Sequence, residues 1–153
     1  VDGLVGSEMC IRDSPYIDVS QKNKLSQNKQ AGARKKPERV EGTLSCELPK
    51  TLVKKNDIHI TSKRNFDCFQ DTELDMLLKR TLNVKNIIIC GVNTDTCVYG
   101  TTFGASNRGY NPIVIECCTG SMRGEDQHKT ALKIMSQSIA WVMKKEEILN
   151  KLN

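Results

Sequence analysis

The sequence predicts an α/β fold with a mainly parallel sheet, because short apolar strand segments alternate with helical segments along the chain. Helices between successive strands bring those strands parallel through right-handed crossovers. The chain has 153 residues, of which 38% are hydrophobic and 27% charged, which is enough for one domain with a hydrophobic core. No apolar run approaches the roughly 20 residues that span a bilayer, so we expect no membrane partner.

The first 39 residues do not fit this alternation. Leu4 to Asp13 matches one reading frame of a common sequencing adaptor, so we interpret residues 1–14 as an artefactual leader and expect the first strand of the fold to be missing. Residues 15–39 hold seven basic side chains against two acidic ones. We interpret them as a solvated loop or disordered segment rather than a nucleic-acid arm, because no aromatics interleave with the charges. The folded domain is therefore placed at residues 40–153.

The first elements of that domain follow from periodicity. Polar and apolar residues alternate over residues 57–61 and predict a strand that ends near Lys63. A helix is expected to open at Asp71, because the leucines that follow recur at i, i+3 and i+4 on one face. The β-branched block at residues 86–90 is typical of a buried strand. Residues 43–49 are expected to form a loop with one helical turn.

A helix is predicted next, over residues 94–108. Thr94 or Asp95 is the expected N-cap, and Gly109 is the expected C-cap. The apolar run at residues 112–116 predicts the following strand.

The C-terminal part is predicted to be helical in two pieces. The first helix covers residues 125–142, where apolar side chains form one stripe: Leu132, Met135, Ile139 and Val142. A short terminal helix is expected over residues 145–152.

The cysteines point to a reducing compartment rather than to a metal site. Their number, seven, is odd, and no C-x-x-C pair occurs. The two histidines, His59 and His128, lie far from any cysteine cluster in the sequence, so we expect no zinc and no other metal. Free thiols are typical of a cytoplasmic protein.

Cys97 is the main candidate for chemistry. It lies in the run GVNTDTCV at residues 91–98, where a strand gives way to a helix. A helix N-terminus favours a thiolate over a thiol, and the thiolate is the nucleophile. Such a turn also lies at the carboxyl edge of the sheet, where open α/β folds bind ligands. The alternative is a buried core cysteine.

Lys63 is the second candidate, because it follows the strand predicted at residues 57–61. The carboxyl ends of parallel neighbours meet at one edge, so its ammonium is expected beside Cys97, where it would lower the thiol pKa. On its own, a lysine after a strand is more often a solvated surface residue.

Together these motifs resemble the isochorismatase-like cysteine hydrolases, a family that includes nicotinamidases, N-carbamoylsarcosine amidohydrolases and biuret hydrolases. The resemblance covers about residues 40–145 and rests on Lys63, on Phe66 followed by Thr72-Glu73-Leu74, and on GVNTDTCV. Residues 94–97, with Gly124-Glu125-Asp126-x-His128 downstream, look closest to the biuret and carbamoyl-amide branch. The resemblance implies a three-layer, Rossmann-like fold.

The resemblance also implies a mechanism without a cofactor. Cys97 would attack a planar carbonyl carbon of a small amide or ureide and form an acyl-enzyme, with Lys63 beside it. The family has a non-proline cis peptide in this turn, here Val92–Asn93. The N–H groups of Asn93 and Cys97 would form the oxyanion hole. Phe66, Phe69 and Cys118 are possible pocket residues; core packing is an equal alternative for the phenylalanines, and a small buried thiol is the alternative for Cys118.

The third member of the family's catalytic set, an Asp after the first strand, is not found in this sequence. Asp18 is the nearest imitation, but no long strand precedes it. The main hypothesis is therefore that the parent protein is a C–N hydrolase, and we expect this fragment itself to be inactive because it lacks the base. The alternative is a non-catalytic fragment or scaffold. A redox-sensing thiol protein is a third possibility, with Cys117 or Cys118 as resolving thiol. We expect a small-molecule substrate, no nucleic acid, and a homo-oligomer.

Overall fold

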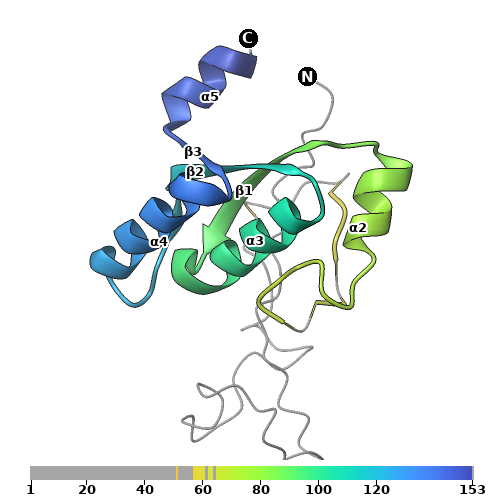
Figure 1. Ribbon diagram of the computed structural model, residues 1–153, viewed down its shortest axis with the longest axis horizontal. Helices are drawn as coiled ribbons and strands as arrows, with labels where there is room; N and C mark the ends of the chain where they lie inside the picture. Colours follow the sequence, from red (N-terminus) through yellow and green to blue (C-terminus); the bar gives the residue numbers. More distant parts are fainter. Residues whose placement is uncertain (1–50, 52–56, 61, 64, 153) are drawn as a thin grey trace, which may run out of the picture.

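The computed structural model describes residues 51, 57–60, 62–63 and 65–152. Its strands form a parallel sheet in the order β1-β2-β3, and helices connect and flank them (Figure 1). The α/β fold class expected from the alternation of segments is thereby confirmed. Several expectations fall outside the described residues: the leader at 1–14, the polar segment at 15–39, Asp18, and the turn at 43–49.

The strand predicted at residues 57–61 is wrong over the part that the structure describes. Residues 57–60 form neither strand nor helix, and Thr61 lies outside the description. Alternating polarity is necessary for a half-buried strand, but a strand also needs a hydrogen-bonded neighbour, which periodicity alone cannot supply. Ile60 is nevertheless buried in the core, so the segment is anchored by one apolar side chain.

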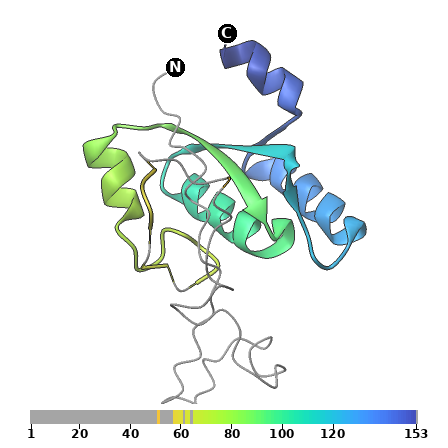
Figure 2. The same ribbon diagram turned by 180° about the vertical axis from the view of Figure 1, so that it is seen from behind.

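In the described sheet, the edge strand β1 (Asn86–Val92) pairs with the central strand β2 (Asn111–Gly120), and Figures 1 and 2 show the two side by side from opposite directions. Both are longer than predicted. Their pairing is interrupted by a bulge, because Ile89 lies opposite Val114 whereas Gly91 lies opposite Thr119. The extra residues are in β2, and a bulge of this kind re-aims the end of a strand.

The helix expected near Asp71 begins slightly later. It consists of α2 (Leu74–Met76), which continues into the π-helical turn η3 (Leu77–Thr81). The N–H of Leu82 donates to the carbonyl of Leu77 at 3.0 Å, which is the i→i+5 bond of a π-turn.

The helix predicted over residues 94–108 is present in two parts, a π-helical turn η4 (Thr94–Val98) and α3 (Tyr99–Asn107). The expected N-cap is wrong: Asn93 occupies that position, and its side chain makes no capping bond. Gly109 ends the helix with φ of +82°, a conformation that glycine adopts without strain.

The long C-terminal helix was predicted too long. It forms α4 (Glu125–Ser138), and the segment Trp141–Met143 is instead strand β3, paired in parallel with β2. The N–H groups of both Ile139 and Ala140 donate to the Met135 carbonyl at 3.0 Å, which closes the helix before the strand begins. The terminal helix α5 (Lys145–Leu152) is as predicted.

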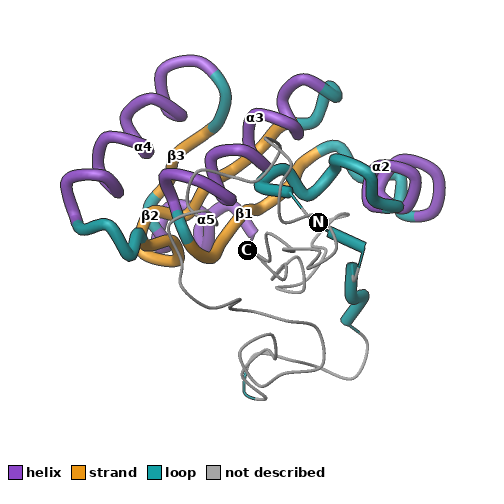
Figure 3. Tube along the Cα trace, turned by 90° about the horizontal axis from the view of Figure 1, so that it is seen from below, coloured by secondary structure: helices purple, strands orange, loops and turns teal. Residues whose placement is uncertain are grey.

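The hydrophobic core lies between the sheet and the helices of one face. Figure 3 shows α3 and α4 on the same side of the strands. Leu78, Val114, Ala105 and Met135 are fully buried there, with 0% of their surface exposed. None of the described helices is both long and apolar enough to cross a membrane.

Candidate active site

Cys97 lies just beyond the carboxyl end of β1, in the turn η4. Gly91 has φ of +120°, which side chains rarely adopt, and the peptide bond between Val92 and Asn93 is cis. The carbonyl of Asn93 then accepts hydrogen bonds from the N–H groups of Thr96 and Val98, each at 3.1 Å. This closed turn holds Cys97 in its fourth position, where the residue is 5% exposed.

Lys63 is a buried lysine, with 0% of its surface exposed, rather than a solvated one. Its charge acts on the thiol of Cys68, which Cys97 also influences. Burial raises the pKa of Cys68 to about 12, and the Lys63 ammonium opposes that rise. Lys63, Cys68 and Cys97 are therefore neighbours in one electrostatic environment, although they come from three different segments of the chain.

The segment that follows Lys63 packs on α3 through two glycines. A Cβ on Gly100 would lie 3.3 Å from the backbone of Phe66, and one on Gly104 would lie 2.5 Å from the Asp67 carboxylate. Thr101 sits between them and donates to the Phe66 carbonyl at 3.3 Å. This close approach seats the segment against the helix that starts at the turn.

Cys68 is fixed by the same helix. Its N–H donates to Thr101 Oγ1 at 3.2 Å, and its sulfur lies 2.7 Å from that oxygen. Its carbonyl accepts a hydrogen bond from Thr72 Oγ1 at 2.5 Å. Neither Thr101 nor this role of Cys68 was predicted from the sequence, because the contact joins residues 33 positions apart.

The two possible pocket phenylalanines differ in position. Phe69 is buried and stacks on Tyr110 with ring centroids 5.5 Å apart, and the Arg108 guanidinium lies 4.9 Å from its ring. These contacts favour core packing for Phe69. Phe66 is half-buried against Gly100 and remains available as a pocket wall.

Cys118 lies with other thiols on the sheet. Its sulfur is 4.0 Å from that of Cys117, and it interacts with Cys90 on the neighbouring strand. All three are exposed. Cys97 acts electrostatically on the thiol of Cys68.

The loop between β2 and α4 forms the other side of the turn. Asn93 Oδ1 accepts the N–H of Met122 at 2.9 Å, and Asp95 Oδ1 accepts the Ser121 hydroxyl at 2.6 Å. Arg123 pairs with the second Asp95 oxygen. Burial alone would raise the pKa of Asp95, but the Ser121 and Arg123 hydrogen bonds lower it below its usual value.

His128, which the sequence suggested only as part of a motif, contacts the turn directly. Its Nδ1 lies 2.8 Å from the hydroxyl of Thr94, a side chain with 0% of its surface exposed. Within the described residues, no group of His, Cys, Asp and Glu side chains is arranged to hold a metal ion.

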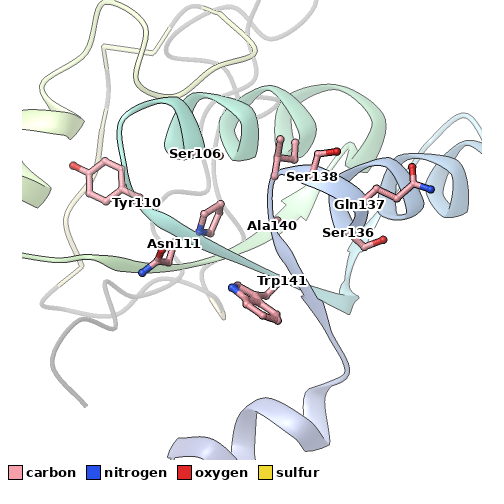
Figure 4. Close-up of a pocket in the computed structure, with 10 residues that line it drawn as sticks. Ser106, Tyr110, Asn111, Ser136, Gln137, Ser138, Ala140 and Trp141 are labelled. Carbon is pink, nitrogen blue, oxygen red and sulfur yellow. The ribbon is translucent and has the colours of Figure 1, made fainter.

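The structure also has a hollow of about 350 Å³, and Figure 4 shows the side chains that line it. Ser106, Asn111, Ser138 and Trp141 are among its lining residues. Because Asn111 and Trp141 begin their strands, this hollow is at the amino ends of the strands, whereas Cys97 follows the carboxyl end of β1. We assign it no part in the chemistry of Cys97.

Several solved structures share this fold, and they include proteins named as hydrolases. An isochorismatase-like hydrolase from Alkaliphilus metalliredigens aligns with a TM-score of 0.69 and 25% identity, over 74% of this chain and 62% of that one. The nicotinamidase SaPncA from Staphylococcus aureus aligns with a TM-score of 0.62 and 29% identity, over 69% of each chain. The fold is thus that of the isochorismatase-like proteins.

The Isochorismatase domain matches residues 11–147, so the chain belongs to the isochorismatase family. The uncharacterized isochorismatase family protein YecD from Escherichia coli is 33% identical over 97 residues, which are 63% of this chain and 50% of that protein. The uncharacterized isochorismatase family protein YwoC from Bacillus subtilis is 28% identical over 105 residues, 69% of this chain and 54% of that protein. The chain thus matches about half the length of these two relatives.

Proposed function

We propose that the protein is a cysteine hydrolase that cleaves a C–N bond of a small amide or ureide, with Cys97 as nucleophile. The observation that carries this proposal is that the buried Cys97 of the turn and the buried Lys63 both act electrostatically on Cys68. The similarity to a nicotinamidase supports an amide as the substrate class. No cofactor is needed for such chemistry.

The reaction proceeds through a thioester. The Cys97 thiolate attacks the carbonyl carbon, and the C=O electron pair moves to the oxygen, which the N–H groups of Asn93 and Cys97 stabilise. One such donor contributes roughly 2.7–4 kcal/mol in the transition state. The C–N bond then breaks, and the nitrogen leaves as ammonia or an amine after gaining a proton. Water attacks the thioester carbonyl, releases the acid product and returns the thiol.

Lys63 has a distinct role in this scheme. An ammonium close to the thiol favours the thiolate and offsets the negative charge that develops on the carbonyl oxygen. The proton acceptor in the family's set is an aspartate, and we assign none of the described residues to that role. We further propose a cytoplasmic homo-oligomer that acts on a small molecule and binds neither nucleic acid nor membrane.

Ammonia release tests the proposal. The full-length protein is assayed with an aromatic carboxamide, an N-carbamoyl amino acid and a ureide, and the same assay is run on its Cys97→Ser variant. We expect the substitution to lower the rate of ammonia release by about 10³-fold or more, because the serine hydroxyl is not ionised at neutral pH. Cys90→Ser, at another exposed thiol, is the matched control and should retain turnover. Unchanged ammonia release by Cys97→Ser would refute the assignment of the nucleophile.

The alternative is a non-catalytic member of the family, and the observation that favours it is the lack of the family's aspartate in the sequence. It predicts no ammonia release from any of the three substrates, together with a Cys97 thiol that reacts no faster at neutral pH than the exposed Cys118. A Cys97 thiol that is alkylated faster than Cys118 would favour the hydrolase.

A further inference from the structure

Three consecutive side chains of the turn are bonded to the same distant segment. Asn93, Thr94 and Asp95 each contact residues 121–128, the loop after β2 and the start of α4. We call residues 121–128 the clamp segment. Because side chains that follow one another in a turn normally point in different directions, their shared anchor fixes the turn in more than one direction.

The bond between Thr94 and His128 is the best-placed of these contacts. The Thr94 side chain is fully buried, and its hydroxyl lies 2.8 Å from His128 Nδ1. The N–H of His128 donates to the Gly124 carbonyl at 3.2 Å, so the imidazole extends from a hydrogen-bonded first turn of α4. Removing the hydrogen-bond partner of a buried hydroxyl lowers the stability of the folded chain. The Thr94 hydroxyl is therefore held in the position where it can reach His128.

We propose that His128 is a positioning residue for Cys97, acting through Thr94; the proposal rests on the proposed function. Thr94 is the first residue of η4, and Cys97 is the fourth. Holding the Thr94 side chain therefore sets the rotation of the turn and with it the place of the Cys97 sulfur. A displacement of about 1 Å at a reacting atom can reduce a rate by about 10²-fold.

The second arm of the clamp segment is weaker. Arg123 is 37% exposed at its side chain, and exposed ion pairs contribute little. Asp95 also keeps its hydrogen bond from Ser121 when the guanidinium is removed. We therefore expect Arg123→Ala to slow the reactions of the Cys97 thiol less than His128→Ala does.

The test compares His128→Ala, His128→Asn and the control Gln127→Ala, an exposed neighbour on the same helix. An asparagine places an oxygen or nitrogen near the position of Nδ1, so it should rescue the contact. We expect His128→Ala to lower kcat by about 10- to 100-fold with little change in KM, because positioning acts on the chemical step. His128→Asn and Gln127→Ala should stay within about 3-fold of the parent chain.

A second measurement does not depend on turnover. Iodoacetamide alkylation of Cys97 is followed by mass spectrometry across pH, with the exposed Cys118 as internal reference. His128→Ala should slow Cys97 alkylation and shift its pH profile, while Cys118 is unchanged. Thr94→Val should do the same, and the double variant should be no slower than either single one, because both remove one contact.

The outcomes separate the two proposals. If Cys97→Ser retains turnover, the proposed function fails. If Cys97→Ser abolishes turnover but His128→Ala behaves like Gln127→Ala in both measurements, the positioning role of His128 is overturned. Additive effects of Thr94→Val and His128→Ala would overturn it as well. Thermal unfolding of each variant identifies a general loss of fold, in which case the rescue by His128→Asn decides.

Discussion

Cys97 and Cys68 are both buried thiols, yet their surroundings assign them different chemistry. Cys97 lies in a turn at the end of a strand, with the N–H groups of a helical start nearby. Cys68 lies under a threonine in the core, and burial raises its pKa to about 12. A thiol with so high a pKa stays protonated at neutral pH and is a poor nucleophile.

This difference gives a prediction for the two thiols. At pH 7, iodoacetamide should alkylate Cys97 at least about 10-fold faster than Cys68, since the thiolate is the reacting form. Peptide mapping by mass spectrometry measures both rates in one sample. Lys63→Met should lower the alkylation rate of Cys97 and so reduce the difference in rate between Cys97 and Cys68. Equal rates for the two thiols in the parent chain would contradict this account of the site.

At the scale of elements, the segment of residues 65–70 packs closely on α3 at Gly100 and Gly104. An alanine at position 104 would place its Cβ 2.5 Å from the Asp67 carboxylate, which is held by the N–H of Phe69 at 2.9 Å and by Arg108 at 3.3 Å. We expect Gly104→Ala to lower the free energy of unfolding by about 1–3 kcal/mol, the usual cost of overpacking.

The sign of this effect should reverse when the obstacle is removed. In an Asp67→Ala background, Gly104→Ala should raise the free energy of unfolding by up to about 1 kcal/mol, because alanine is the better helix former. Asn107→Ala, at an exposed position of the same helix, reports helix propensity alone. Urea unfolding measures all four variants. A Gly104→Ala loss that persists without Asp67 would show that the carboxylate is not the obstacle.

The same scale shows how far a sequence can predict structure. Local patterns predicted β1, β2 and α5 because their signals lie within one short run of residues. The spacing of Ile139 and Val142 fits a helix equally well, so β3 could not be distinguished without knowing that β2 lies beside it. The strand predicted at 57–61 failed for the same reason: periodicity shows which face is apolar but does not identify a pairing partner.

The candidate site divides in the same way. Cys97 and Lys63 could be proposed from short motifs, and both are buried. The contacts of His128, Ser121 and Arg123 join residues 26–34 positions apart, and no local pattern encodes such contacts. The one available signal for His128 was its place in the Gly124-Glu125-Asp126-x-His128 motif.

For the whole molecule, stability should be greatest near neutral pH and decline on both sides. Burial is the largest influence on the pKa values of Asp75 and Asp95 and acts to raise them. The hydrogen bonds and charges around each carboxylate, led by the bonds from Tyr110 and Ser121 respectively, together outweigh it, and both pKa values are lowered. Groups with lowered pKa stabilise the folded chain above their unfolded value of about 3.9 and lose that contribution as the pH falls through the folded value.

The alkaline side depends on a group of the opposite kind. Cys68 titrates at about pH 12 in the folded chain but near 8.5 when unfolded, so stability should fall as the pH rises above about 8.5. Urea unfolding from pH 3 to pH 10 measures both limbs. Cys68→Ala should make the alkaline limb shallower and leave the acid limb unchanged; the Cys90 thiol, whose pKa burial also raises to about 12, keeps part of the alkaline slope. An alkaline slope that is the same with and without Cys68 would contradict this assignment.

The bulge between β1 and β2 has a consequence for how this chain could vary in length. Ile115 of β2 still pairs with Met143 of β3, but the next three residues of β2, 116–118, have no partner in the registers with β1 and β3, whereas one residue of β1 separates Ile89 from Gly91. A residue gained or lost at 116–118 would leave the pairs on either side intact. A gain in β1 would turn every later side chain to the opposite face, and the strand would deliver the cysteine to the wrong side of the sheet. Insertions and deletions in homologous chains should therefore collect in β2 at this point and be excluded from β1.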